Sequence, residues 1–430
     1  MVPENHGISS AAIPRFATTS FKSSLYLDDA RIGRFRPQAR KLHQQFLELV
    51  ADAPSSRNVL DFLIHGADKI STIGDRHRRG LKAWHGVNHF RASIANKLQN
   101  VTARDVYFGG RSRGLMHLGA RILSRSCSRI LSVDLNWPVY QHELAETAKK
   151  VDCDLVVARI QDHIIAERWD VDDLCTYLCD AYDRNRCDGL FLPAVDSMGI
   201  RMPIAEIVRR LRTKQHVRFV LVDAAQALGY TGLNEIGSSA DFIVAGTHKW
   251  VGSYIPLGIG IATNPRSQQW IANFSHSAIG TKGGGDSLLH MLHSIDKGCD
   301  TLFPETVNLG GLIAGFGAWT ATPSPNSALE TRISNADLVA SIAEFNGWEP
   351  LRPNESMRSG SLILQSTNRQ TRQRSTDEIR NSFADSGIVL SAYANGLVRM
   401  AMPETLLTTE QFLWIQDALH SVDNPLRIAC

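Results

Sequence analysis

The sequence predicts an α/β protein with a mostly parallel central sheet and helices on both faces, followed by a smaller α+β domain. Short apolar runs alternate with helix-like stretches between residues 104 and 262, and the character of the chain changes after about residue 300. With 430 residues, 43% hydrophobic and 21% charged, the chain also has the composition of a globular protein with a large core.

Seven apolar runs are the expected strands of the large domain. They begin at Val106, Ile130, Asp154, Gly189, Arg218, Phe242 and Gly258. Between them, Leu115, Leu118 and Ile122 share one helical face, as do Ile204, Ile207, Val208 and Leu211. Strands that alternate with amphipathic helices predict a parallel sheet covered on both sides.

The C-terminal part of the sequence predicts a second domain. A Pro/Ser stretch, TATPSPNS, precedes expected strands near Leu362, in IVLSAY and in GLVRMAM. Thr408 and Gln411 form a capping-box pattern at the start of a closing helix. We therefore expect an N-terminal arm over residues 1–25, a large domain over 26–300 and a small domain over 301–430.

Composition excludes several classes of protein and site. Lys and Arg total 46 against 43 Asp and Glu, a net +3 that predicts neither a nucleic-acid nor a membrane-surface partner. Seven scattered cysteines predict reduced thiols, and Cys175 and Cys179 lack the Cys-x-x-Cys spacing of structural zinc, so no metal site is expected. No signal sequence, membrane span or nucleotide-binding Gly-x-Gly-x-x-Gly turn is visible, and we expect a cytoplasmic protein.

Polar side chains follow two of the expected strands. Asp223 ends one run and Gln226 lies three residues on, while the next run is followed by Thr247, His248 and Lys249. The carboxyl ends of parallel strands form the ligand edge of such sheets. An amine, a carboxylate and several donors at one edge are the groups that pyridoxal phosphate (PLP) requires of a protein.

The blocks VDAAQALG, ADFIVAGTHKWVG and PLGIGIAT resemble the signature of the class V aminotransferase and cysteine-desulfurase-like family, which are fold type I PLP-dependent enzymes. The resemblance extends in outline over about residues 26–422. It implies that Lys249 forms the Schiff base with PLP, that Asp223 pairs with the pyridine nitrogen and that Gln226 bonds the phenolic oxygen. It also implies that Thr247 and His248 help to hold the phosphate.

The run VYFGGRSRGL falls where the family has a strand, a small-residue turn and a helix that receives the phosphate. The resemblance implies that Gly109, Gly110, Arg111 and Ser112 form this cradle. The family usually has a Thr-rich turn here, whereas this sequence has Arg111 and Arg113. The two arginines also fit a solvated helix start.

Other segments resemble the family more loosely. By this resemblance Trp137 stacks on the cofactor ring, either Asp196 or Ser197 lies beside it, and Arg399 binds the α-carboxylate of the substrate. Thr281 falls where members of the family have a loop that reaches the phosphate of the neighbouring subunit, and this resemblance implies a homodimer with the active site at the subunit interface.

Each candidate also has an ordinary structural interpretation. Lys249 is a solvated surface lysine in that interpretation, Asp223 a helix N-cap, His248 and Trp137 core residues, and Arg399 one half of a surface ion pair. The multi-residue pattern favours the functional interpretation of Lys249 and Asp223.

The resemblance implies an enzyme that acts on an amino acid through an external aldimine, and we favour an aminotransferase. A cysteine nucleophile is absent between residue 340 and Arg399, which disfavours a persulfide-forming desulfurase. The alternatives are a PLP-dependent lyase, either a C-S lyase or a kynureninase-like enzyme, or an epimerase. A catalytically silent PLP-fold binding protein is the alternative from another class.

Overall fold

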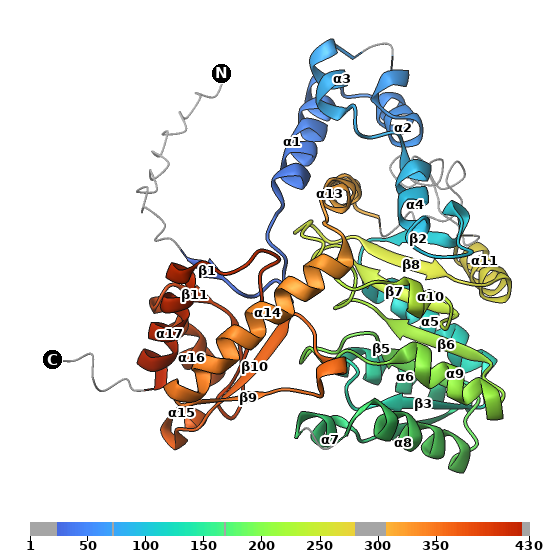
Figure 1. Ribbon diagram of the computed structural model, residues 1–430. Coiled ribbons are helices and arrows are strands. Elements are labelled where there is room, and N and C mark those ends of the chain that lie inside the picture. The colour runs from blue at the N-terminus through green and yellow to red at the C-terminus, as the bar shows by residue number, and fades with distance from the viewer. Residues whose placement is uncertain (1–23, 71–72, 167–168, 280–306, 424–430) are drawn as a thin grey trace, which may run out of the picture.

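The computed structural model describes residues 24–70, 73–166, 169–279 and 307–423. A seven-stranded sheet with helices on both faces forms the large domain, and a four-stranded sheet with its own helices forms the small one (Figure 1). The α/β fold expected from the sequence is thus confirmed.

All seven expected strands of the large domain are present. Their order in the sheet is β2-β8-β7-β6-β5-β3-β4. β8 is antiparallel to both of its neighbours, and the remaining pairs are parallel, so the sheet is mostly parallel as expected. The strands are β2 Val106–Gly109, β3 Arg129–Val133, β4 Asp154–Ala158, β5 Gly189–Pro193, β6 Phe219–Asp223, β7 Phe242–Gly246 and β8 Gly258–Ala262.

Both faces of this sheet are buried. In β5, Leu190 and Leu192 point into one apolar core and Phe191 points into the other, since successive side chains alternate between faces. On the Phe191 side lie α5 Ser112–Ser126, α6 Pro138–Lys149 and α11 Pro265–Ile279. On the other side lie α7 Gln161–Ile165, α8 Val171–Arg184, α9 Ile204–Lys214 and α13 Leu309–Thr320. The short α10 Asn234–Gly237 precedes β7.

Four N-terminal helices, which the sequence patterns did not reveal, stand over one end of the large domain (Figure 1). They are α1 Pro37–Asp52, α2 Ser56–His65, α3 Asp75–Leu81 and α4 Val87–Ala95. α1 packs against α13, where a Cβ on Gly317 would lie 2.9 Å from the Cα of Ala39. Glycine is needed there for the two helices to approach so closely.

The small domain is built on an antiparallel sheet in the order β12-β13-β10-β9. Its strands are β9 Trp348–Leu351, β10 Ser361–Ser366, β12 Ser391–Tyr393 and β13 Leu397–Ala401. Its helices are α14 Pro325–Ala343, α15 Arg369–Gln373, α16 Thr376–Asp385 and α17 Thr409–Asp423. The expected capping box is confirmed, because Gln411 N donates to Thr408 Oγ1 and Thr408 N donates to Gln411 Oε1.

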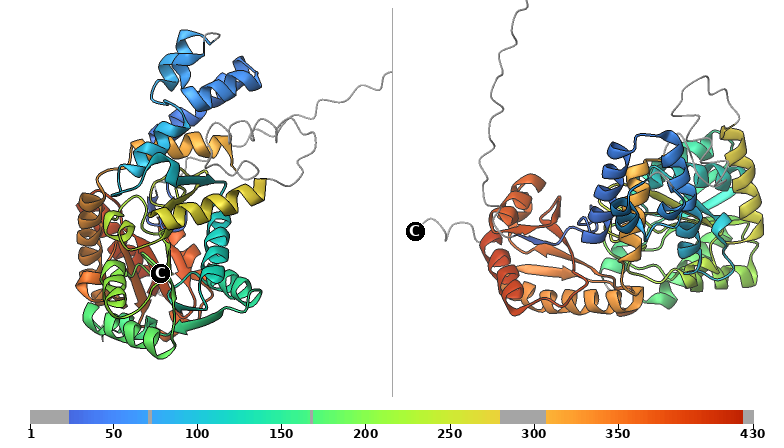
Figure 2. Two further views of the ribbon diagram at one scale, coloured as in Figure 1. Left: turned by 90° about the vertical axis from the view of Figure 1, so that its right-hand side faces the viewer. Right: turned by 90° about the horizontal axis from the view of Figure 1, so that it is seen from above.

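The N-terminal part of the described chain is joined to the small domain. β1 Leu25–Tyr26 pairs in parallel with β11 Ile388–Val389, and Leu25 and Leu27 belong to the small domain's core. Leu312 and Phe316 of α13, which lie beyond residue 300, pack into the core of the large domain. Seen from above in Figure 2, the two domains lie side by side, with the start of the described chain at the small domain.

Candidate active site

Asp223 and Lys249 lie at the same edge of the sheet because they follow the neighbouring parallel strands β6 and β7. Burial, helped by the positive charge of Arg399, lowers the pKa of Lys249 to about 8 against the opposing effect of the charge of Asp223. Burial also raises the pKa of Asp223, against the opposing effects of the Ala225 amide and of Lys249. The edge therefore brings together a partly neutral amine and a buried carboxyl group.

The carboxylate of Asp223 makes a local hydrogen bond. Its Oδ1 accepts from the backbone N of Ala225 at 2.9 Å. The residues after Asp223 form turns and not a helix, so Asp223 is not an N-cap. Within the described part of the chain no hydrogen bond reaches its second oxygen, which leaves an acceptor at the ligand edge.

His248 lies beside Arg111 of the expected phosphate turn. Burial, Lys249 and Arg111 together lower the pKa of His248 to about 4, so its ring is neutral at physiological pH. Its Nδ1 is buried and has no hydrogen-bond partner among the described residues. A buried polar atom without a partner costs free energy, so this nitrogen is suited to a ligand atom.

The turn before α5 is packed tightly against β8. A Cβ on Gly258 would lie 2.5 Å from the carbonyl carbon and oxygen of Arg111 and 2.8 Å from the N of Ser112. Arg111 is the N-cap residue of the 15-residue α5, and its side chain does not cap the helix. The first amides of a helix form an anion site when no side chain satisfies them.

A pocket of about 790 Å³ opens on this turn. It is lined by Gly109, Gly110, Arg111, Arg113, Gly114, Leu115, His117, Glu143, Pro256 and Asn308. Lys249 is not among its lining residues but borders another pocket, of about 400 Å³, together with Trp250, Arg36 and Glu404. The turn and Lys249 thus border two different pockets.

Tyr140 is a site residue that the sequence patterns did not reveal. Its hydroxyl lies 2.9 Å from Oγ of the buried Ser112. Burial raises the pKa of Tyr140 to about 12, and the charge of Asp223 acts in the same direction. Tyr140 therefore contacts the first residue of α5, and its pKa responds to the charge of the carboxyl group at the end of β6. Trp137, three residues earlier, is 47% exposed at the N-cap of α6.

Two expected ligand residues make buried bonds within the chain. Nε2 of Gln226 donates to Ala30 O at 2.9 Å, and its Oε1 accepts from Trp250 Nε1 at 2.8 Å. The hydroxyl of Thr247 is 2.8 Å from that of Ser253. The cofactor roles of Gln226 and Thr247 stay predictions, and both would require these bonds to rearrange or to be shared.

The turn of Asp196 and Ser197 connects the edge to Arg399. Oδ1 of Asp196 accepts from the amides of Met198 at 3.0 Å and Ile200 at 2.7 Å, and burial raises its pKa to about 7. The carbonyl oxygen of Ser197 accepts from Arg399 Nη1 at 2.7 Å. Asp196 thus shapes the turn, while the backbone of Ser197 positions Arg399.

Arg399 has a further partner that the sequence patterns did not reveal. Its Nη2 lies 3.6 Å from Oδ1 of Asp28 and donates to Ser391 Oγ at 3.2 Å. Arg399 is 3% exposed, so it is not part of a surface ion pair.

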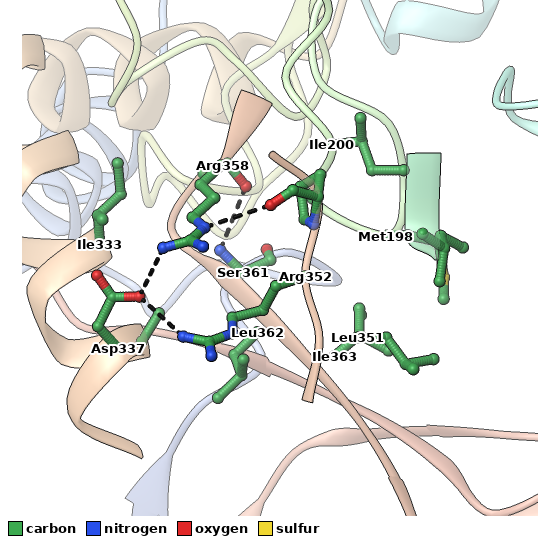
Figure 3. A pocket seen from close by; sticks show the side chains of 15 residues that line it. Met198, Ile200, Ile333, Asp337, Leu351, Arg352, Arg358, Ser361, Leu362 and Ile363 are labelled. Atoms are coloured by element: carbon green, nitrogen blue, oxygen red, sulfur yellow. Dashed lines mark hydrogen bonds and ion pairs between the residues drawn. The ribbon is translucent and has the colours of Figure 1, made fainter. Parts of the chain in front are cut away.

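Figure 3 shows the contact between this turn and the small domain. Met198 and Ile200 border a cavity of about 20 Å³, and nearby Asp337 pairs with Arg352 at 3.4 Å and with Arg358 at 3.3 Å. Such a volume holds about one water molecule and no larger ligand. The contact therefore supports the turn of Ser197 and is not a binding site.

Three further expectations from the sequence concern Thr281, metal sites and membrane spans. Thr281 lies outside the described residues. Within the described ranges no group of three or more His, Cys, Asp or Glu side chains is arranged to hold a metal ion. None of the helices in those ranges combines the length and the apolar character that crossing a membrane requires.

Part of the sequence matches the model of a known protein family. The model of the class-V aminotransferases matches residues 186–283, which include Asp223, His248 and Lys249. This match confirms the resemblance to the class V family. No sequence among the curated proteins matches the chain.

Solved structures confirm the fold over almost the whole chain. A cysteine desulfurase from Escherichia coli is 16% identical with a TM-score of 0.68, and the match covers 94% of this chain and 95% of that one. A cysteine desulfurase from Thermococcus onnurineus is 12% identical with a TM-score of 0.67, covering 94% and 95%. A C-DES mutant described with glycine covalently linked to its PLP cofactor is 14% identical with a TM-score of 0.66, covering 93% and 96%.

The described residues fit the cofactor of the class V family, PLP. A partly buried amine with a lowered pKa, a buried carboxyl group, an imidazole nitrogen without a partner among the described residues and a helix N-terminus beside Arg111 supply the groups that PLP requires. The expectation from the sequence about the cofactor is thus supported by side chains that the fold brings to one edge.

Proposed function

We propose that this chain is a PLP-dependent enzyme that acts on the amino group of an amino-acid-like substrate, and that it is an aminotransferase. The placement of Lys249 and the buried Asp223 at the ends of the paired parallel strands β6 and β7 carries the proposal, and the lowered pKa of Lys249 supports it. A pKa of about 8 leaves an appreciable share of the amine neutral near pH 7, and only the neutral amine can attack a carbonyl group.

Bound PLP would supply the electron sink for bond cleavage at the substrate's α-carbon. Asp223, buried at the end of β6, would keep a proton on the pyridine nitrogen. The first amides of α5, with Arg111 and Nδ1 of His248, would bind the phosphate. Lys249 Nζ, once released from the cofactor, would remove and return the α-proton, and Arg399 would bind the substrate carboxylate.

A lyase is the second candidate. Two of the similar solved structures are cysteine desulfurases, and this favours cleavage of a C–S bond. The absence of cysteine between residue 340 and Arg399 argues against the persulfide-forming type. Incubation with L-cysteine and with L-alanine plus a keto acid separates the candidates, because a lyase releases sulfide and an aminotransferase exchanges the amino group.

The first experiment is an absorbance spectrum of the protein purified with PLP, before and after borohydride reduction. We expect a visible band that reduction removes, that Lys249→Ala lacks and that Lys149→Ala retains, since Lys149 is exposed on α6. A folded wild type with excess PLP and no band would overturn the proposal and favour a silent binding protein.

We further propose that the enzyme works as a cytoplasmic homodimer whose active site lies at the subunit interface. The resemblance of Thr281 and its loop to the family's subunit-bridging segment supports the dimer. Light scattering of the purified protein should give twice the mass of one chain, and a monomer with a full PLP band would contradict this part of the proposal.

A further inference from the structure

The guanidinium of Arg399 has an internal carboxylate beside it. Nη2 of Arg399 lies 3.6 Å from Oδ1 of Asp28, and the two side chains are only 4% and 7% exposed. Oγ of Ser391 joins them, since it donates to Asp28 Oδ1 at 2.5 Å and accepts from Arg399 Nη2 at 3.2 Å. The chain itself thus supplies a carboxylate to the arginine that we assign to the substrate.

The backbone holds Asp28 firmly in this place. The preceding residue, Leu27, is fully buried; its N donates to Val389 O at 2.8 Å and its O accepts from Ala401 N at 2.7 Å. Ser391 and Arg399 are directly opposite each other on β12 and β13. Three backbone segments therefore fix the contact, unlike an ion pair between mobile surface side chains.

We propose that Asp28 is a specificity-determining residue that competes with the substrate's α-carboxylate for Arg399. The inference rests on the proposed function, in which Arg399 binds that carboxylate. Two carboxylates beside one guanidinium repel each other, and the repulsion is strong where burial excludes water. Amines with a neutral group in place of the carboxylate escape this repulsion. The preference of this site for α-carboxylates over such amines is therefore weaker than it would be if Arg399 had no carboxylate partner within the chain.

Protonation of Asp28 removes the competition. Burial raises the pKa of Asp28, while Ser391, Arg399 and Arg31 oppose the rise. Tyr26 also faces it, but burial and the charge of Asp28 raise the pKa of Tyr26 to about 12, so the phenol stays neutral. Binding of an α-carboxylate should therefore strengthen as the pH falls through the pKa of Asp28.

The test compares L-alanine with L-alaninamide, which has a neutral amide in place of the carboxylate. Each is titrated into PLP-loaded protein while the visible band is followed. We expect Asp28→Asn to bind L-alanine about tenfold more tightly than the wild type does, with L-alaninamide changed by less than about twofold. Unchanged or weaker binding of L-alanine would overturn the proposal and make Asp28 a residue that only orients Arg399.

Asp29→Asn is the matched control. Asp29 is the next residue and is also buried, but its carboxylate accepts from the backbone N and from Nη2 of Arg34 and not from Arg399. We expect the affinity of this variant for L-alanine relative to L-alaninamide to match that of the wild type. A tenfold gain in Asp29→Asn as well would indicate a general charge effect and would contradict a specific competition.

Two further measurements test the competition of Asp28 for Arg399. The first serves if Asp28→Asn does not fold, and the second serves if no PLP band forms. In the wild type, the preference for L-alanine over L-alaninamide should grow as the pH is lowered from about 7, where both free amines are protonated; a preference that stays constant or falls down to the lowest pH at which the protein remains folded would overturn the proposal. Without PLP, sodium propionate should raise the Tm of Asp28→Asn more than that of the wild type, and equal shifts would overturn it. If the wild type lacks the visible PLP band, the proposed function is refuted, but the competition of Asp28 for Arg399 is not.

Discussion

The side-chain oxygens of Ser112 and Tyr140 lie 2.9 Å apart and join the first residue of α5 to the first turn of α6. Tyr140→Phe removes this bond and keeps the ring. A net contribution of about 1 kcal/mol for such a bond predicts a free energy of unfolding that is lower by about that amount. Urea unfolding of the cofactor-free protein measures the difference. Trp137→Phe is the comparison, since Trp137 is 47% exposed, and an equal or larger loss of stability there would contradict the role of the Tyr140 bond.

Arg399→Gln should raise the pKa of Lys249. The positive charge of Arg399 lowers the pKa of this amine, so its removal shifts the value upward from about 8. The rate of reductive methylation of Lys249 against pH, followed by mass spectrometry in the cofactor-free protein, gives the midpoint. An unchanged or lower midpoint would show that Arg399 does not act on the lysine.

Asp223→Asn should lower the pKa of Lys249, and with it the pH midpoint of the reductive methylation of this lysine. The carboxylate of Asp223 favours the charged form of Lys249, and its loss lowers the pKa of the lysine. In the PLP-loaded enzyme the same change removes the partner of the pyridine nitrogen and should reduce kcat by roughly 10²-fold or more. Retention of full activity would contradict the role of Asp223, whatever happens to the midpoint.

Gly258→Ala should disturb the phosphate turn. Its Cβ would lie 2.5 Å from the backbone of Arg111, which cannot move aside as a flexible side chain can. We expect a loss of stability of about 1–3 kcal/mol and weaker PLP binding. Gly114→Ala is the control for stability, since nothing lies within 4 Å of its Cβ and alanine favours the helix by about 0.5–1 kcal/mol. Equal unfolding midpoints for the two variants in urea would contradict the tight packing.

The sequence was sufficient for the large sheet because its strands are buried on both faces and read as continuous apolar runs, as in FVLVD of β6. It also placed Asp223 and Lys249 correctly at one edge, since parallel strands end together. The contact of Arg399 with Asp28 could not be predicted, because it joins residues 371 positions apart through the pairing of a two-residue strand. Tyr140 was missed because an aromatic residue in a helical pattern is usually a core residue.

The buried hydrogen bonds of Gln226 could not be predicted from the sequence either. Its spacing from Asp223 indicates a ligand residue, but its amide is held by Trp250 and by Ala30, which lies 196 positions away. Such long-range bonds depend on how the N-terminal segment crosses the sheet edge. Local patterns contain no information on that crossing.

The most direct test of the central claim is to reduce the PLP-loaded protein with borohydride, digest it and locate the pyridoxyl group by mass spectrometry. We expect a single modified peptide in which Lys249 bears the group, with the modification absent from Lys249→Ala. Modification of another lysine in the wild type, or of none, would contradict the assignment of Lys249 and with it the proposed enzyme.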